Sequence, residues 1–234
     1  MSNSDIEQSQ IRYARLAGFM YLFIIAAYLL GAYVTSRFEV PGNIAETAHR
    51  IMEYELLYRF GLALGLLNAL CAVLLAMGLY VAVKAIDKNL ALLALAFELV
   101  YVAVGGVLNL IDFVFLKLHI GLDSVSALDA KQLSALVDLH SYADSVGLNI
   151  TCIFYGAGSI LFFYLFLKSN YIPRILAALG LFGSVLVPLT GFASLIVPQP
   201  AKMLQLGWLP IFVAEISVGL WLLFKGINLR PQED

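Results

Sequence analysis

Long apolar segments with almost no charge in their middles alternate along the chain with shorter polar stretches. The hydrocarbon core of a bilayer is about 30 Å thick, and roughly 20 helical residues cross it. Segments of that length lie at residues 16–36, 56–83, 90–116, 146–167, 175–197 and 206–224. The pattern predicts an all-α fold: a polytopic membrane protein of six transmembrane helices, forming a single domain over residues 1–234. The polar residues 1–11 are expected to form a mobile tail.

Composition supports this class and excludes several others. The chain is 62% hydrophobic and 13% charged, whereas soluble domains are about one quarter charged. The net charge of −2 argues neither for nor against a nucleic-acid partner, but no basic cluster is long enough to suggest one, and none is expected. No phosphate-binding loop, dinucleotide fingerprint or Cys-x-x-Cys pair is present, so no cofactor is expected. The expected surroundings are a lipid bilayer.

The positions of Lys and Arg predict an orientation. They crowd into the short turns near residues 84–89 and 168–174 and near both ends of the chain. On the other side they are mixed with acidic residues in longer connections. Because short cytoplasmic loops carry an excess of cations, both termini are predicted to lie in the cytoplasm.

The two longer external connections are expected to contain short amphipathic helices. Asn43-x-x-Glu46 and Ser126-x-x-Asp129 both match the pattern that caps a helix N-terminus. Apolar residues follow each pattern at helical spacing, which suits a helix lying on a membrane surface. Plain loops remain the alternative, and the first helix could also run straight into the segment at 56–83.

Two carboxyl groups fall near the middle of apolar segments, Glu98 in 90–116 and Glu215 in 206–224. Loss of hydration favours the neutral form of such a group. Each is therefore either a proton-linked functional group, alone or as half of a pair, or a permanently protonated side chain bonded to a neighbouring helix. The sequence leaves both readings open.

A polar stripe extends from Glu98 along one helix. Glu98, Gly105, Asn109 and Asp112 recur at the spacing of one helical face, and such a face is expected to avoid lipid. The turn centred near residue 86 follows Arg59 by 27 positions and precedes Asp112 by 26. We therefore expect Arg59 and Asp112 to lie at similar depth and to pair directly or through water.

These polar positions predict a cavity that opens to the outside. Its expected lining is Arg59, Asn68, Glu98, Asn109, Asp112, Asn149 and Glu215. The function that this favours is non-enzymatic binding or transport of a small molecule, an ion or a lipid. No residue is predicted to be catalytic.

Two other functions remain open. An intramembrane metal-dependent enzyme would use the external histidines and carboxylates, whose weak candidates for metal ligands are His49, Glu53, His119, His140 and Asp144; their spacing matches no zinc motif. An accessory subunit of a membrane complex, or a homo-oligomer, would use Gly61-x-x-x-Gly65, a spacing that permits close helix packing within or between chains.

Several stretches together resemble a known family. They are Arg15-Leu-Ala-Gly-Phe-Met-Tyr-Leu, Leu57-Tyr-Arg-Phe-Gly, Leu79-Tyr with the helix start at Leu90, and Phe154-Tyr-Gly followed by Lys168-Ser-Asn-Tyr-Ile-Pro-Arg. The chain resembles an uncharacterised family of small bacterial integral membrane proteins, a domain of unknown function. The resemblance implies six helices in a bacterial plasma (inner) membrane. It carries over no activity and no catalytic residue.

Overall fold

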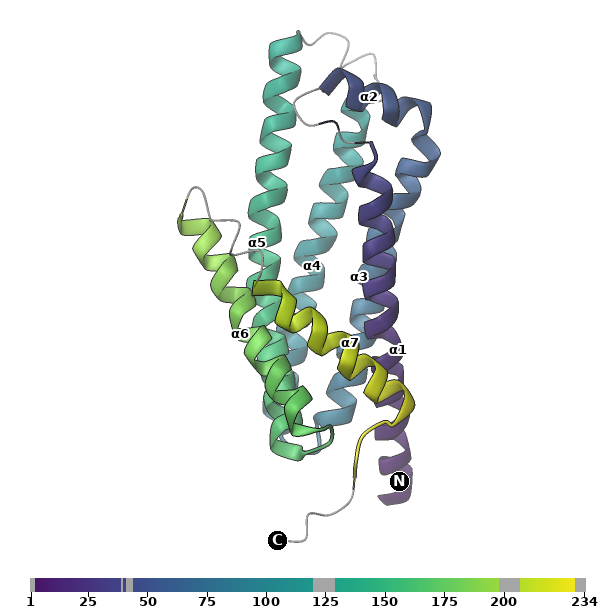
Figure 1. Cartoon of the computed structure of the whole chain (residues 1–234), viewed down its shortest axis with the longest axis vertical. Helices are drawn as coiled ribbons and strands as arrows, with labels where there is room; N and C mark the ends of the chain where they lie inside the picture. The colour runs from purple at the N-terminus through teal and green to yellow at the C-terminus, as the bar shows by residue number, and fades with distance from the viewer. Residues whose placement is uncertain (1–2, 39, 41–43, 120–128, 198–206, 230–234) are drawn as a thin grey trace.

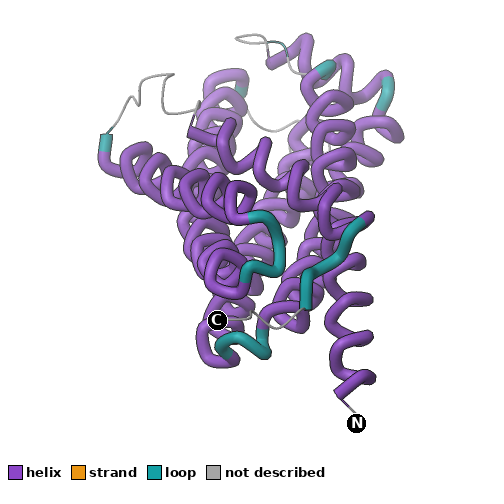
Figure 2. The backbone as a smooth tube through the Cα atoms, turned by 60° about the horizontal axis from the view of Figure 1, so that its bottom comes forward, coloured by secondary structure: helices purple, strands orange, loops and turns teal. Residues whose placement is uncertain are grey.

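The computed structural model describes residues 3–38, 40, 44–119, 129–197 and 207–229. In these ranges the chain forms helices and no strand (Figures 1 and 2). The helices are α1 (Asn3–Ser36), α2 (Ile44–Glu53), α3 (Glu55–Val83), α4 (Lys88–His119), α5 (Ala130–Ser169), α6 (Arg174–Ile196) and α7 (Leu209–Phe224). The predicted all-α fold is therefore confirmed.

Within the described ranges, five helices are long and apolar enough to cross a membrane: α1, α3, α4, α5 and α6. The sixth predicted span corresponds to α7, which is apolar but has only 16 residues. This is fewer than the roughly 20 residues that a bilayer core requires. Pro210 stands in the first turn of α7, where its missing N–H and fixed φ suit the start of a helix. The structure thus gives five full-length candidate spans and one shorter apolar helix.

The long helices pack side by side, and α7 crosses them obliquely (Figure 1). Helix α1 contacts α3 and α7, helix α5 contacts α4 and α6, and α7 also contacts α6. The start of α1 and the end of α7 lie at one end of the bundle, where Gly226 lies near Ile11 and Arg15. The opposite end holds α2 and the start of α5, and we call it the α2 end.

The first helix begins earlier than the sequence indicates. Residues 3–11 belong to α1, whereas the sequence pattern predicts a mobile polar tail over residues 1–11. Gln10 is buried and donates a hydrogen bond of 3.2 Å to the carbonyl of Ala82 at the end of α3. It also bonds Tyr171 after α5, where burial raises the pKa of the phenol and this bond partly offsets the increase. Contacts with distant residues hold this polar turn in a helix.

The two longer connections differ from each other. Helix α2 occupies the first, and its Ile51 is buried against Val34, Phe38 and Leu116. Tyr54, with φ −124° and ψ 39°, separates α2 from α3, so the two do not run together. The predicted cap residue Asn43 lies outside the described residues.

In the second connection the described residues hold no separate short helix, because α5 runs unbroken for 40 residues. Its cap is Asp129, whose carboxylate accepts a 2.8 Å bond from the backbone N–H of Gln132, while the Gln132 side chain accepts one from Asp129. The predicted partner Ser126 lies outside the described residues. At 1.5 Å per residue α5 is about 60 Å long, so it exceeds the thickness of a bilayer core and its first turns project toward the α2 end.

Candidate functional site

The residues predicted to line one cavity fall into two groups. Asp112 and Arg59 lie toward the α2 end, whereas Glu98 and Glu215 lie deeper in the bundle. Two surface pockets in the described part of the chain lie elsewhere, one around Asn170–Arg174 with Trp221 and Asn228, the other on the first turns of α1. Neither pocket includes a residue of the predicted lining.

Arg59 and Asp112 have partners other than each other. Arg59 forms an ion pair of 2.6 Å with Glu55, one turn earlier on α3. Asp112 Oδ1 lies 3.2 Å from Nε2 of His140 on α5, within hydrogen-bond distance. Arg59 and Asp112 thus form no direct pair in the described part of the chain, and their pairing through water stays a prediction. The depth argument gives the level of a residue along the bundle, but not the direction in which its side chain points.

Two of the asparagines bond to their own helices. Asn109 Nδ2 donates to the carbonyl of Gly105 at 2.9 Å, and Asn149 Nδ2 donates to Ser145 at 2.8 Å. The side chain of Asn109 also lies against Gly65 of α3, where any larger residue would meet its Oδ1 atom. Gly61 similarly faces Val34 and Thr35 of α1. The Gly61-x-x-x-Gly65 spacing thus serves close packing within the chain.

Asn68 on α3 differs from the other two. Its Oδ1 atom is buried and accepts no hydrogen bond from the described residues. Gly65 meets Asn109 across the antiparallel pair α3–α4, and one turn along in that register Asn68 lies level with Gly105 and Gly106. A Cβ atom at either glycine would meet nothing within 4 Å. Asn68 therefore lies at the level of an open part of the α4 surface.

Glu98 lies on the buried side of α4, with only 9% of its surface exposed. Ser159 of α5 donates a long hydrogen bond of 3.4 Å to Glu98 Oε1. Gly158 of α5 makes room for the carboxyl, because a Cβ at that position would come within 2.7 Å of Oε1. Helix α5 therefore provides both the space and a hydrogen-bond donor for the Glu98 side chain.

Glu215 projects from α7 toward the same helix. Tyr155 of α5 donates a 2.5 Å hydrogen bond to Glu215 Oε1. The Tyr155 ring stacks on Trp208 with centroids 6.1 Å apart and an interplanar angle of 11°, and lies 5.4 Å from the ring of Tyr101. Aromatic contacts on two sides thus orient the phenol toward the carboxyl.

Glu98 and Glu215 lie close enough for their charges to interact, and Tyr21 of α1 interacts with both. We call Glu98, Glu215, Tyr155 and Ser159 the carboxyl cluster. Among the described residues, no Lys, Arg or His forms an ion pair with either Glu98 or Glu215. A carboxylate held away from water and without a cation is costly. This cost is largest for Glu98, the more buried of the two carboxyls.

Tyr155 and Ser159 were not predicted as site residues. They stand one turn apart on α5 and carry the two hydroxyls that meet the carboxyls. The available signal was this pair of hydroxyls on one face of an apolar helix, a pattern used for bonding between membrane helices. Their spacing along α5 does not indicate which helix the two hydroxyls contact.

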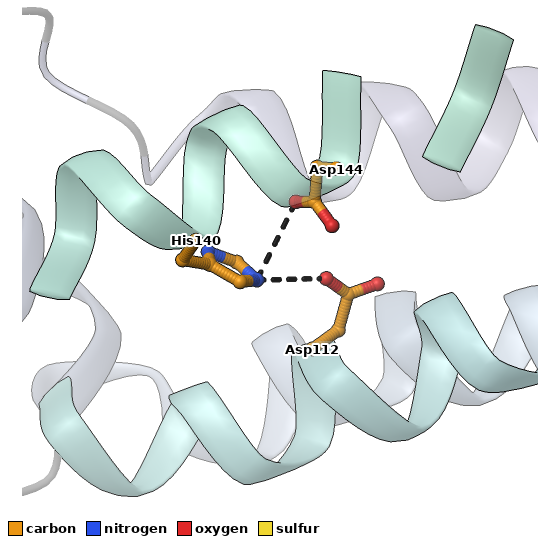
Figure 3. A group of neighbouring side chains, drawn as sticks. All are labelled: Asp112, His140 and Asp144. Atoms are coloured by element: carbon orange, nitrogen blue, oxygen red, sulfur yellow. Dashed lines mark hydrogen bonds and ion pairs between the residues drawn. The ribbon is translucent and has the colours of Figure 1, made fainter. Parts of the chain in front are cut away.

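A second group lies at the α2 end, where Asp112, His140 and Asp144 converge from α4 and α5 (Figure 3). His140 Nε2 lies 3.2 Å from Asp112 Oδ1 and 3.4 Å from Asp144 Oδ2. Of the weak metal candidates, the structure thus brings together His140 and Asp144 and adds Asp112. His49 and Glu53 lie on α2 and are exposed, and the side chain of His119 lies outside the described residues.

The comparison with known families gives one result. The model of the family described as "Domain of unknown function (DUF4386)" matches residues 16–226. The chain belongs to this family. The match includes the carboxyl cluster and the Asp112 group, and it confirms the resemblance to an uncharacterised family that the sequence motifs indicate. No curated protein and no solved structure matches the chain.

Proposed function

We propose that the protein binds a small molecule or ion, and moves it across a membrane, in steps linked to protonation of Glu98 and Glu215. One observation supports this above the others: a buried carboxyl, Glu98, and a partly buried one, Glu215, meet the hydroxyls of a third helix and have no cationic partner among the described residues. Membrane-embedded carboxyls of this kind occur in proton relays and ion pathways.

The hydroxyl partners suit a site that changes its charge. A hydroxyl both donates and accepts, and its hydrogen rotates freely. Tyr155 and Ser159 can therefore donate to a carboxylate or accept from a protonated acid without moving their oxygen atoms. A proton and a cation then compete for the same carboxyl, and this competition links the binding of one to the release of the other.

The titratable groups around the cluster come from several helices. Tyr21 lies on α1, Tyr101 on α4 and Tyr155 on α5, and all interact electrostatically with the carboxyls. Cys152, another titratable group, also lies on α5 and is buried. Within α6, which contacts α5 and α7, no side chain after Arg174 is titratable. Glu98 and Glu215 are thus the two carboxyl groups of the cluster.

The proposed location is the bacterial plasma membrane, with both termini in the cytoplasm. Five candidate spans support a membrane location, and the cations in the short α3–α4 and α5–α6 turns support the orientation. In this orientation the α2 end and the Asp112 group face the outside.

Proteoliposomes containing a pH-sensitive dye test the proposal. A pH step is imposed across the vesicle membrane, alone and with an opposing Na⁺ or K⁺ gradient. The wild-type chain should move protons faster than protein-free vesicles under at least one of these gradients. Glu98→Gln and Glu215→Gln should each reduce the rate to that of protein-free vesicles, because Gln cannot exchange a proton.

Glu46→Gln is the matched control. It removes an exposed carboxylate that pairs with Arg50 on α2, so its proton movement should equal that of the wild type. A wild-type rate equal to that of empty vesicles under every gradient would contradict the proposal. So would Glu98→Gln and Glu215→Gln variants that both transport like the wild type.

One observation favours a second candidate, an accessory subunit of a membrane complex. Helix α4 is the least buried of the five candidate spans, with 17% of its apolar window buried. Gly105 and Gly106 on this helix have space around them, which a partner helix could fill. Copurification of a second membrane protein that cross-links to a cysteine placed at Gly106 would favour this function over transport.

A further inference from the structure

We propose that Asp112, His140 and Asp144 form a binding site for a divalent transition metal, of which Zn²⁺ is the best match. One imidazole nitrogen and two carboxylate oxygens offer their ligand atoms within 4.8 Å of one another. They come from two helices, so a bound ion would join α4 to α5. Figure 3 shows the Nε2 edge of His140 directed at both carboxylates. The site is separate from the carboxyl cluster and does not depend on the proposed transport function.

The distances between the ligand atoms fit a small, four-coordinate ion. Zn–N and Zn–O bonds of about 2.1 Å at tetrahedral angles place neighbouring ligand atoms about 3.4 Å apart. His140 Nε2 lies 3.2 Å and 3.4 Å from the two carboxylate oxygens. The two carboxylate oxygens lie within 4.8 Å of each other, so side-chain rotation would bring them to the spacing that a bound ion requires. The remaining coordination position would go to water or to another side chain.

The chemistry of the ligands favours zinc over Ca²⁺ or Mg²⁺. An imidazole nitrogen suits zinc and its neighbours in the first transition row, whereas Ca²⁺ and Mg²⁺ take oxygen ligands almost exclusively. Two carboxylates and one neutral imidazole would also leave a bound Zn²⁺ with no net charge to stabilise.

The helices hold the three ligands in place. Asp112 and Phe115 lie one turn apart on α4, and the Phe115 ring stacks on the His140 ring with centroids 4.2 Å apart and an interplanar angle of 18°. This contact fixes the plane of the imidazole. Close by, Gly147 of α5 allows the Leu108 side chain of α4 to approach its backbone. The two helices are thus in close contact on one side of the site, and oriented ligands of this kind are typical of metal sites.

The position of the site suggests its consequence. The first turns of α5 extend beyond the part of the helix that contacts α6 (Figure 1). His140 precedes Asn149, the residue of α5 that meets Gly191 near the end of α6, by nine residues, and Asp112 lies near the end of α4. A bound metal would fix this part of α5 to α4 and would stabilise the folded chain, since a ligand that binds only the folded state raises its stability.

Isothermal titration with Zn²⁺ tests the site on the full chain, purified with a tag that lacks histidine and treated with a chelator. The wild type should bind one Zn²⁺ per chain and should show a higher melting temperature with Zn²⁺. His140→Ala and Asp112→Asn should each weaken binding by about tenfold or more, as loss of metal-site residues does, and should lose the thermal shift. Ca²⁺ should bind far more weakly than Zn²⁺.

His49→Ala is the matched control, because His49 and Glu53 form another histidine–carboxylate pair one helical turn apart, on α2. It should bind Zn²⁺ like the wild type. Should His140→Ala fail to fold, Asp144→Asn and the absorption of bound Co²⁺, which reports tetrahedral coordination, provide the same test. A wild-type chain without stoichiometric Zn²⁺, or variants at Asp112 and His140 that retain its affinity, would overturn the proposal and leave side-chain contact between α4 and α5 as the role of the group.

Discussion

Replacing Gly18 with Ala should destabilise the folded chain by about 1–3 kcal/mol, the usual cost of inserting a methyl group into a packed core. A Cβ at Gly18 would lie 2.5 Å from the backbone N of Leu223 and 2.7 Å from the carbonyl O of Gly219. These are backbone atoms of α7 and cannot rotate away. On its other side α7 meets Gly183 of α6, where a Cβ would lie 2.5 Å from the N of Ile211. Helix α7 is therefore packed closely on both sides and cannot shift away from α1 without moving into α6.

Gly105→Ala is the matched control for this prediction. Gly105 also lies in the interior of an apolar helix, but a Cβ there would meet nothing within 4 Å. Alanine is the better helix former by up to about 1 kcal/mol, so this variant should be as stable as the wild type or more so. Thermal unfolding in detergent compares the two. Equal melting temperatures for Gly18→Ala and Gly105→Ala would show that α1 and α7 are not in backbone contact.

The second large effect is expected when an arginine replaces Glu98. Arginine keeps its charge in proteins, so Glu98→Arg places a cation beside Glu215 and leaves that carboxylate as its counter-ion. Adding Glu215→Gln removes the counter-ion and leaves a buried charge without a partner. The double variant should therefore be less stable than Glu98→Arg alone by about 3–5 kcal/mol, the cost of breaking a buried ion pair.

Glu215→Gln in the wild-type background completes a double-mutant cycle. There it removes no ion pair, so its effect on stability should be much smaller than in the Glu98→Arg background. Unfolding free energies of the four proteins in detergent provide the measurement. Additive effects would mean that Glu98 and Glu215 do not interact, and would remove the carboxyl pair from the proposed mechanism.

The helical architecture could be predicted from the sequence because each long helix is apolar over its whole length. Where local pattern and tertiary contacts disagree, the structure differs from the prediction. Residues 3–11 are polar, yet they form the first turns of α1 because Gln10 bonds to Ala82 and packs near Tyr171. Helix α5 continues through a polar stretch from Ala130 because Asp129 and Gln132 cap it. Hydropathy does not show which distant residues a side chain contacts. It also does not show which of several possible residues caps a helix.

The positions of the site residues along their helices could be predicted from the sequence, but the partners of their side chains could not. The positions of Glu98 and Glu215 near the middle of apolar segments marked both as unusual, and the structure buries Glu98 and bonds Glu215 to Tyr155. The position of Asp112 near the end of its helix was also predicted. Its partner was not: His140 comes from α5, 28 positions along the chain, while Arg59 turns to Glu55. Side-chain direction depends on how helices rotate against each other, and a single sequence does not specify this.

Infrared spectroscopy of the carboxyl groups tests the central claim most directly, because a protonated carboxylic acid absorbs at a frequency distinct from that of a carboxylate. Spectra of the folded protein in lipid are compared across a range of pH, and Glu98→Gln and Glu215→Gln assign each band. We expect two protonated-acid bands that disappear as the pH rises and that are lost in turn with each substitution. Bands assigned to Glu98 and Glu215 that stay unchanged at every pH at which the protein remains folded would mean permanently neutral side chains with a purely structural role, and would contradict the account.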